Sequence, residues 1–418
     1  MSSEQHTVVI IGGGTGGIST AALLRRKSPQ LDIALIDPAE YHYYQPAWTL
    51  VGGGAYAAEK TQRKLSSLLP KGVKHIAQSV AKLLPEDNQV ELADGTKVGY
   101  KQLVVAAGIQ INWGAIKGLE ESLGKNGVSS NYRYDLAPYT WELVKNFKGG
   151  KAIFTQPAGA VKCPGAPQKA LYLSADYFKK QGVKADVEFR SGAASIFGVP
   201  FYAKALNKII ASYHAATHYN QQLVEVRGEE KIAVFEHQAD GETVREEVAY
   251  DLLHVVPPQG APDFIANSPL AAAEGGWLDV DQSTLRHKKF ANVFGIGDCT
   301  TTPNSKTAAA IKSQAPVLVG NLLQALASQG LEHSYDGYAA CPITTENGKV
   351  LLAEFTYGGN VAPSFAADPR VPRGFYWWLK RSFIPAFYWH GLLKGRNITP
   401  RHKSREFSEE LPQGLVEN

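Results

Sequence analysis

The sequence predicts an α/β fold with two Rossmann-like, dinucleotide-binding domains and a C-terminal amphipathic region that associates with a membrane. Three observations support this prediction. An apolar strand runs into a glycine-rich loop at residues 8–17, a strand-and-helix pattern starts again near Lys151, and a basic, aromatic segment without acidic residues follows Asp368. A length of 418 residues exceeds one ordinary core and suits two or three domains.

The composition is that of a folded protein, since 44% of the residues are hydrophobic and 20% are charged. A net charge of only +4 argues against a dedicated nucleic-acid binder, so we expect no nucleic-acid partner. The three cysteines form no CxxC pair, and we expect no metal site. There is no apolar run of about 18 residues, as a membrane span needs.

The first unit has the pattern of a dinucleotide-binding βαβ motif. The apolar strand 8–11 is followed by GxGxxG with its glycines at Gly12, Gly14 and Gly17, and then by a helical segment. Gly12 permits the tight turn, Gly14 lets the backbone approach a pyrophosphate, and Gly17 allows close packing of helix on strand. Asp37 ends the second strand, where a ribose hydroxyl needs an acceptor. The alternative, a glycine-rich turn without ligand, does not account for the whole unit.

Two later strands decide between FAD and NAD for the first unit. Residues 103–108 form an apolar strand that ends in Gly108, and residues 292–298 form another that ends in Asp298. Both resemble the fingerprints of flavoproteins with two dinucleotide-binding domains, in which the second acid meets the ribityl chain of the flavin. Asp298 as a helix cap is the alternative. The combination favours FAD.

A second α/β unit is expected between Gly108 and Trp277, as a degenerate repeat of the first. Its apolar strands and its helix are predicted at residues 152–155, 170–179, 187–189 and 252–256. A nicotinamide domain needs GxGxxG directly after the first of these strands, but Gly159 and Gly165 are six positions apart and Pro164 lacks an amide donor. We therefore expect a reductant other than a nicotinamide.

The loop after the first strand of the second unit contains a cysteine, Cys163, where a nicotinamide domain has its phosphate-binding glycines. The neighbouring lysines, Lys162 and Lys169, favour its thiolate form, although a small buried hydrophobe is the commoner role of a free cysteine. Cys341 precedes a proline and is expected on extended backbone. Cys299 is expected to pack in the protein interior and to take no part in the chemistry. From the residues alone, a Cys163–Cys341 redox pair and two unrelated thiols stay equally open.

Five continuous motifs resemble sulfide:quinone oxidoreductases of the mitochondrial-type branch and its bacterial relatives, over essentially the whole chain. They are VVIIGGGTGG (8–17), HYYQPAWTLVGGGA (42–55), VKCPGAPQKALYLS (161–174), NVFGIGDCTTTPNSKTAAA (292–310) and YDGYAACPIT (335–344).

The resemblance implies a site for non-covalent FAD and a redox disulfide between Cys163 and Cys341. No cysteine precedes Cys163, so a covalent flavin tether is not expected. Lys306, expected at a helix start, would stabilise reduced flavin, and a solvated lysine is the alternative. The FAD-binding positions that the resemblance implies are Gly12, Gly14, Thr15, Gly16, Gly17, Asp37, Gln45, Val80, Gly108, Asp298 and Lys306.

The resemblance also implies a reaction. Hydrosulfide attacks the sulfur of Cys341 in the disulfide, which leaves a persulfide there and expels Cys163 as a thiolate. Two electrons pass through FAD to ubiquinone or another membrane quinone. The sulfane sulfur goes to a small acceptor, and sulfite, glutathione, coenzyme A and polysulfide all stay open, as does a homo-oligomer.

The C-terminal segment combines cations with aromatic rings. A nucleic-acid surface or an oligomer interface are alternatives, but such short amphipathic pieces suit a monotopic anchor at a membrane surface. Pro385 is expected to split the stretch into two helical pieces. The basic and aromatic residues are Arg370, Arg373, Lys380, Arg381, Lys394, Arg396, Arg401, Lys403 and Arg405, with Phe375, Tyr376, Trp377, Trp378, Phe383, Phe387, Tyr388 and Trp389.

The predicted division is a FAD-binding domain at 1–110 and 276–333, a second Rossmann-like domain at 111–275 and a quinone- and membrane-interaction region at 334–418. No signal or transit peptide is recognisable, so a peripheral protein on the cytoplasmic face of the inner or cytoplasmic membrane is expected. Rival functions are a type II NADH:quinone dehydrogenase, a flavocytochrome c-type sulfide dehydrogenase subunit and a non-enzymatic scaffold. No histidine is marked as a general base, and structural roles are expected for His42 and His75.

Overall fold

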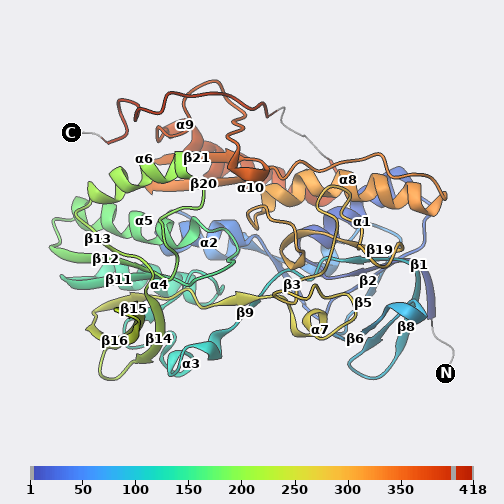
Figure 1. The fold of residues 1–418 in the computed structure, drawn as a ribbon, viewed down its shortest axis with the longest axis horizontal. Helices are drawn as coiled ribbons and strands as arrows, with labels where there is room; N and C mark the ends of the chain where they lie inside the picture. The colour runs from blue at the N-terminus through green and yellow to red at the C-terminus, as the bar shows by residue number, and fades with distance from the viewer. Residues whose placement is uncertain (1–3, 397–401, 417–418) are drawn as a thin grey trace.

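The computed structural model describes residues 4–396 and 402–416, and it consists of two α/β lobes with the C-terminal elements lying across both (Figure 1). The predicted α/β class with two Rossmann-like sheets is confirmed. In the first lobe the sheet has the order β5-β2-β1-β8-β7-β6, with β19 paired to β8. Its strands are β1 (Glu4–Ile11), β2 (Ile33–Ile36), β5 (Val73–Ile76), β6 (Val80–Leu84), β7 (Gln89–Leu92), β8 (Lys97–Val105) and β19 (Val293–Gly295).

The central strand of this sheet is buried on both faces, as expected for a parallel strand rich in Val and Ile. Val8 and Ile10 pack with α1 (Thr15–Lys27) and α8 (Ala308–Leu326), while Val9 and Ile11 pack into a second core on the opposite face. The last strand to join, β19, comes from almost 190 residues after β8 and pairs with it in parallel. The chain therefore returns to the first sheet after building the second lobe.

The second lobe is a five-stranded parallel sheet of order β10-β17-β11-β12-β13. Phe154 faces the helices on one side, and Ile153 faces a three-stranded antiparallel sheet on the other. The elements are β10 (Val128–Ser129), β11 (Gly150–Gln156), α5 (Ala166–Lys180), β12 (Ala185–Ser191), α6 (Pro200–Ala211), β13 (Ala216–His218) and β17 (Leu252–His254), with β14 (Gln222–Arg227), β15 (Ile232–Ala239) and β16 (Glu242–Ala249) in the antiparallel layer.

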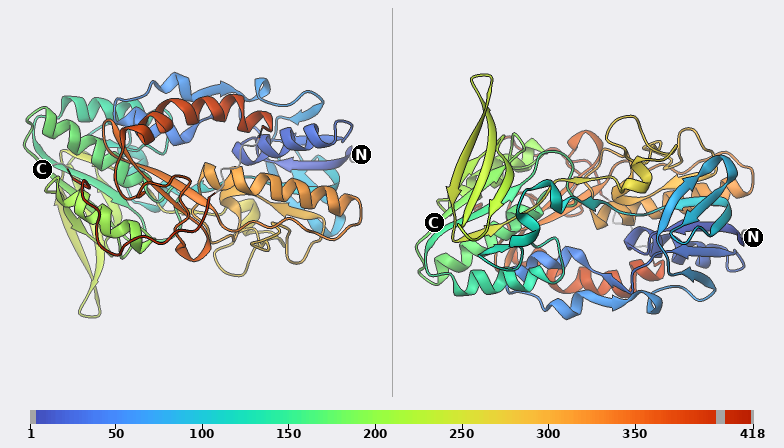
Figure 2. Two further views of the ribbon diagram at one scale, coloured as in Figure 1. Left: turned by 90° about the horizontal axis from the view of Figure 1, so that it is seen from above. Right: turned by 90° about the horizontal axis from the view of Figure 1, so that it is seen from below.

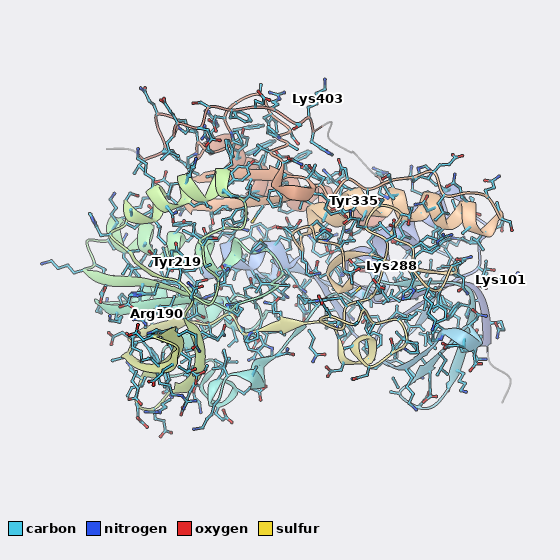
Figure 3. All side chains as sticks on the ribbon, viewed as in Figure 1. Lys101, Arg190, Tyr219, Lys288, Tyr335 and Lys403 are labelled. Atoms are coloured by element: carbon cyan, nitrogen blue, oxygen red, sulfur yellow. The ribbon has the colours of Figure 1, made fainter. Side chains whose placement is uncertain are left out.

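Arg190 joins the two layers of this lobe (Figure 3). Its buried guanidinium donates to both carboxylate oxygens of Glu246 on β16, at 2.8 and 3.1 Å, and to Glu188 on its own strand at 2.7 Å. The hairpin of β15 and β16 projects beyond the lobe (Figure 2). Short elements complete the fold: β3 (Tyr41–Tyr43), α2 (Trp48–Gly52), β4 (Gln62–Lys64), β9 (Gln110–Ile111), α3 (Leu119–Ser122), α4 (Leu136–Asn146), β18 (Gln259–Gly260) and α7 (Asp263–Ala266).

The C-terminal part begins with a hairpin, β20 (Ala339–Glu346) and β21 (Lys349–Phe355), that packs over α5. A long helical segment then runs from one lobe to the other (Figure 2). It comprises α9 (Gly374–Trp378), a π-helical turn (Leu379–Phe383) and α10 (Ile384–His390). The two short helical pieces expected around Pro385 are present as α9 and α10, with the proline in the first turn of α10, but the π-helical turn joins them into one continuous helical run.

The π-helical turn keeps one face of this segment inward. Tyr376, Lys380, Pro385 and Tyr388 are buried, at successive spacings of four, five and three residues. The spacing of five is the π turn itself, which absorbs one residue more than an α-helical turn. Among the described residues, no helix has the length and apolar character to cross a membrane.

The close packing of α1 on the glycine loop after β1 can be tested by substitution. A Cβ at Gly17 would collide with the carbonyl oxygen of Gly12, whereas a Cβ at Gly14 would meet no atom within 4 Å. We predict that Gly17→Ala lowers the thermal unfolding midpoint by several degrees, because overpacking costs about 1–3 kcal/mol. Gly14→Ala, measured in the same calorimetric scan, is expected to keep the midpoint. Equal midpoints for both variants would contradict the packing role of Gly17.

Candidate active site

The structure brings two cysteines together from positions 178 residues apart. Cys163 lies in the loop between β11 and α5, Cys341 lies on β20, and their Sγ atoms are 3.4 Å apart. This distance is longer than a disulfide bond of about 2.05 Å but requires only a small movement to form one. Gly165 makes the approach possible, since a Cβ at this position would lie 2.7 Å from Cys341 Sγ.

The backbone of Cys163 is held in an unusual conformation. Its φ of 55° lies in the left-handed region, which costs a residue with a side chain about 1–2 kcal/mol. Two hydrogen bonds hold it there: its N–H donates to the carbonyl of Lys306 at 2.8 Å, and its own carbonyl accepts from the N–H of Ala166 at 2.7 Å. The cysteine loop is thereby tied to the loop that precedes α8.

A buried ammonium contacts the sulfur of Cys163. Lys169, in the second turn of α5, is 3% exposed, and its Nζ donates to Cys163 Sγ at 2.9 Å. Burial disfavours this charge, but the two cysteine sulfurs outweigh it and raise the pKa of Lys169 above its ordinary value. The sequence offered two lysines, Lys162 and Lys169, as the cation beside Cys163, and in the structure it is Lys169 that contacts the sulfur.

The other candidate, Lys162, points elsewhere. Its Nζ donates to Oε1 of Gln45 at 2.6 Å and lies over the rings of Trp48 and Tyr132, at 5.7 and 5.5 Å. Burial lowers the pKa of Lys162 to about 8. The amide of Gln45, one of the predicted FAD-binding residues, is therefore joined to the cysteine loop through Lys162.

The two thiols have opposite acidities. Two contacts lower the pKa of the Cys163 thiol well below its ordinary range: first the hydrogen bond from Cys341, and then the ammonium of Lys169. Together they outweigh the opposing effect of burial. The same hydrogen bond, together with burial, holds the pKa of Cys341 well above its ordinary range. In the reduced pair, the thiolate is on Cys163.

A second buried lysine, Lys380, reaches the pair from the C-terminal helical segment, so its expected place among the cations of the membrane anchor was wrong. Lys380 is 5% exposed, and its Nζ donates to the carbonyl of Pro342, the residue after Cys341, at 3.0 Å. Burial and the like charge of Lys169 lower its pKa to about 7. Its inward position carried no signal in the sequence, because a lysine within a basic, aromatic segment is the pattern of a solvated face.

Lys306 does not begin a helix as expected, because α8 starts two residues later, after Thr307. The hydroxyl of Thr307 caps the helix by accepting from the N–H of Ala310. Lys306 remains in the loop, where its Nζ donates to the carbonyls of Asp298 and Thr300 at 2.7 and 3.1 Å. The Nζ also lies 4.2 Å from the ring centre of Trp277. Burial raises the pKa of the Asp298 carboxyl.

The glycine loop has the geometry that a pyrophosphate requires. Gly12 has a φ of 102°, and a Cβ there would collide with the carbonyl of Ala106. Gly14 faces open space, and the first amides of α1 have no intrahelical acceptor. Asp37 accepts from the N–H groups of Gly13 and Ala39, at 2.5 and 2.7 Å, and each of its oxygens keeps a lone pair for a further donor. These residues therefore fit the adenosine diphosphate half of FAD.

A buried hydrogen-bonded chain links this loop to the C-terminal helix. The hydroxyl of Tyr388 lies 2.8 Å from Oγ1 of Thr15 and 2.6 Å from Nε2 of His42, whose Nδ1 is 2.9 Å from the carbonyl of Gly13. Burial lowers the pKa of His42. The side chain of Thr15 thus faces α10, which leaves its amide for a ligand. His75 contacts the carbonyl of Asp37 at 3.0 Å.

The remaining predicted positions surround the first sheet. Gly108 follows β8 with a φ of 73° and faces open space. Gly16 packs closely on Ile296, and Val80 begins β6 in the core layer opposite α1. Cys299 is fully buried, and burial raises its pKa to about 11.

A cavity of about 320 Å³ lies between the cysteine loop and the Asp298–Lys306 loop. Its wall includes Val161 and Pro164 on one side, Thr300 and Lys306 on the other, and Trp277. The two loops that carry the predicted site residues thus border one open hollow.

Comparison with known proteins gives a consistent result. The family model described as pyridine nucleotide-disulphide oxidoreductase matches residues 6–151. The chain is 46% identical to the mitochondrial sulfide:quinone oxidoreductase of Dictyostelium discoideum over 93% of its own length and 86% of the relative's. It is 41% identical to the mitochondrial sulfide:quinone oxidoreductase of Mus musculus, over 94% and 88% of the two chains.

A solved structure shares the fold. The sulfide:quinone oxidoreductase from the hyperthermophilic bacterium Aquifex aeolicus superposes with a TM-score of 0.76 at 22% identity, over 95% of this chain and 93% of that one. The structure shows the fold, and the sequence identities to the two mitochondrial relatives show the family. The chain belongs to the sulfide:quinone oxidoreductase family.

Proposed function

We propose that this protein oxidises sulfide through a redox disulfide between Cys163 and Cys341 and passes two electrons to a membrane quinone. The observation that carries the proposal is the close pair of a half-buried Cys163 and a buried Cys341, with an ammonium 2.9 Å from Cys163 Sγ. Cys163 is set in the loop where a nicotinamide-binding domain has its phosphate-binding glycines. The relatives in this family carry the same activity in their names.

FAD is the proposed carrier between the disulfide and the quinone, and when bound it accepts an electron pair from the dithiol and delivers it to the quinone. Gly12, Gly14 and the first amides of α1 would hold its pyrophosphate, and Asp37 its ribose. We assign its remaining contacts to Gly16, Gly17, Thr15, Gln45, Val80, Gly108, Asp298 and Lys306. The corresponding domain division, 1–110 with 276–333, 111–275 and 334–418, is part of this proposal.

The reaction begins with the disulfide. Hydrosulfide attacks Sγ of Cys341, which forms a new S–S bond and breaks the bond to Cys163, so that Cys163 leaves as a thiolate. A small nucleophile then takes the outer sulfur and leaves Cys341 as a thiol, in keeping with its raised pKa. Loss of two electrons and of the Cys341 proton from the pair restores the disulfide. Sulfite, glutathione, coenzyme A or a polysulfide would each serve as the nucleophile.

The electrostatics of the pair fit this direction of attack. The better leaving group in thiol–disulfide exchange is the thiol of lower pKa, which is Cys163. Its backbone is bonded to Lys306, so Cys163 is also the cysteine tied to the proposed flavin site. Cys341 has no exposed surface, and hydrosulfide therefore reaches it only when the neighbouring side chains give way.

The helical segment 374–390 is the proposed membrane contact. Phe375, Trp378 and Phe383 are 51%, 51% and 46% exposed, and their rings stack in a row along the segment. Large aromatic rings are favoured at the boundary between lipid and water, where they anchor proteins that lie on a bilayer. We propose peripheral attachment to the inner or cytoplasmic membrane from its cytoplasmic face, with quinone entering from the lipid.

The central test is anaerobic mixing of purified protein with sulfide or, separately, with NADH. We predict that sulfide bleaches the flavin absorbance and NADH does not. Cys163→Ser and Cys341→Ser are each expected to lower sulfide-dependent quinone reduction at least 100-fold while flavin stays bound. Reduction by NADH alone, or near-normal turnover of either variant, would contradict the proposal.

The role of Lys169 is tested through the acidity of Cys163. In a Cys341→Ser background, Lys169→Met is predicted to raise the pKa of Cys163 by about one unit or more, because the adjacent positive charge is lost. Alkylation by iodoacetamide, measured against pH, would then shift to higher pH. Lys162→Met is the matched control, since its ammonium faces Gln45, and its profile is expected to coincide with the background. A larger shift for Lys162→Met would refute the assignment.

The membrane contact is tested with a triple variant, Phe375→Ser, Trp378→Ser and Phe383→Ser. We predict a shift of most of the protein from the membrane to the soluble fraction, with sulfide-dependent flavin bleaching retained. A double variant at two other exposed apolar positions, Val244→Ser and Leu411→Ser, controls for general loss of surface hydrophobicity. Unchanged membrane binding of the triple variant would rule out this surface.

A further inference from the structure

A second hollow in the protein is lined by positive charge. It measures about 240 Å³ and lies where the last turn of α1 meets the loop before β5 and the turn at Leu392–Lys394. Arg25, Arg26, Lys71 and Lys394 supply four cations from these three elements, and three apolar side chains complete the wall. None of the residues assigned to the sulfide reaction takes part.

Within residues 4–396 and 402–416, no ion pair joins Arg25, Arg26, Lys71 or Lys394 to an acidic side chain. The C-terminus of α1 carries about half a negative charge from its backbone dipoles, which one cation offsets. Four cations therefore leave a strong positive excess around the hollow.

The arrangement of the hollow is held by close packing. The Arg25 guanidinium donates to the carbonyl of Leu31 at 3.1 Å and covers Gly72, where a Cβ would lie 2.6 Å from its Nη2. A Cβ at Gly395 would lie 2.8 Å from the backbone of Ala22 and 2.9 Å from Cδ of Arg26. The turn that carries Lys394 thus packs directly on α1, and the cations are brought together by the fold.

We propose that this hollow binds the phosphate of an anionic phospholipid headgroup. The turn with Lys394 directly continues the helical segment 374–390, and Figure 2 shows α1 beside the end of that segment. Guanidinium groups pair with phosphate in a fork geometry, and the apolar part of the wall suits the glycerol end of the headgroup. The inference rests on the proposed membrane association and adds selectivity for anionic lipid.

The test uses FAD-loaded full-length protein and sedimentation with vesicles of phosphatidylcholine, with and without phosphatidylglycerol. Wild type is expected to prefer the anionic vesicles. Arg26→Gln and Lys71→Gln should each lower binding to them about fivefold and leave binding to neutral vesicles unchanged. Lys27→Gln, one position along the same helix end but outside the hollow, is the matched control. An equal loss for Lys27→Gln, or no preference of wild type for anionic vesicles, would overturn the proposal.

Calorimetry distinguishes a phospholipid headgroup from free inorganic phosphate as the ligand of the hollow. Soluble dihexanoylphosphatidylglycerol is expected to bind saturably to wild type and not to Arg26→Gln/Lys71→Gln, while inorganic phosphate at the same ionic strength binds more weakly. Tighter binding of inorganic phosphate would overturn the lipid assignment. The sulfide bleaching assay on the same preparations should be unaffected by the hollow variants, so a failure of the proposed sulfide activity is recognised independently.

Discussion

The contact between the buried ammonium of Lys169 and the sulfur of Cys163 is the interaction on which the rest of the site depends. A buried charge needs a charged or hydrogen-bonding partner, and in the reduced pair the lowered pKa of Cys163 makes its thiolate that partner for the 3% exposed Lys169. The contact therefore makes Cys163 acidic and holds its loop against α5. It also sets the polarity of the pair, because the Lys169 ammonium donates to Cys163 Sγ and helps to lower the pKa of that thiol, whereas the pKa of Cys341 is held above its ordinary range.

The two Rossmann-like lobes provide the frame that makes this contact possible. In the first lobe the loop after β1 stays open at Gly14, whereas in the second lobe the corresponding loop is occupied by Cys163 in a left-handed conformation. Parallel strands end at the same edge of a sheet, so both loops face the junction of the lobes. The absence of a side chain at Gly165 then lets β20 bring Cys341 to the same place.

Local patterns were enough to predict the central strands of both parallel sheets, because buried parallel strands such as 33–36 are short, continuous and apolar, but not the edge strands or the antiparallel layer β14–β16. The neighbours of Cys163 depend on where α5 begins. Its periodicity shows from residue 170, but the helix starts at Ala166 with Pro167 in its first turn, and this start turns Lys169 toward the sulfur. Thr307 carried a recognisable capping signal that would have placed Lys306 correctly. Lys380 carried none, since a lysine in a basic, aromatic segment is the pattern of a solvated face, whereas tertiary packing buries this one.

The inward direction of Lys380 has a consequence for how the C-terminal segment relates to the enzyme core. A detachable anchor would touch the core only through its linker, yet this segment contributes a hydrogen bond to the strand of Cys341 through Lys380, and Tyr388 links it to the glycine loop. The segment is thus a structural member of both lobes. Truncating the chain before residue 374 would remove the hydrogen bonds to the strand of Cys341 and to the glycine loop together, so we expect the segment and the core to behave as one folded unit.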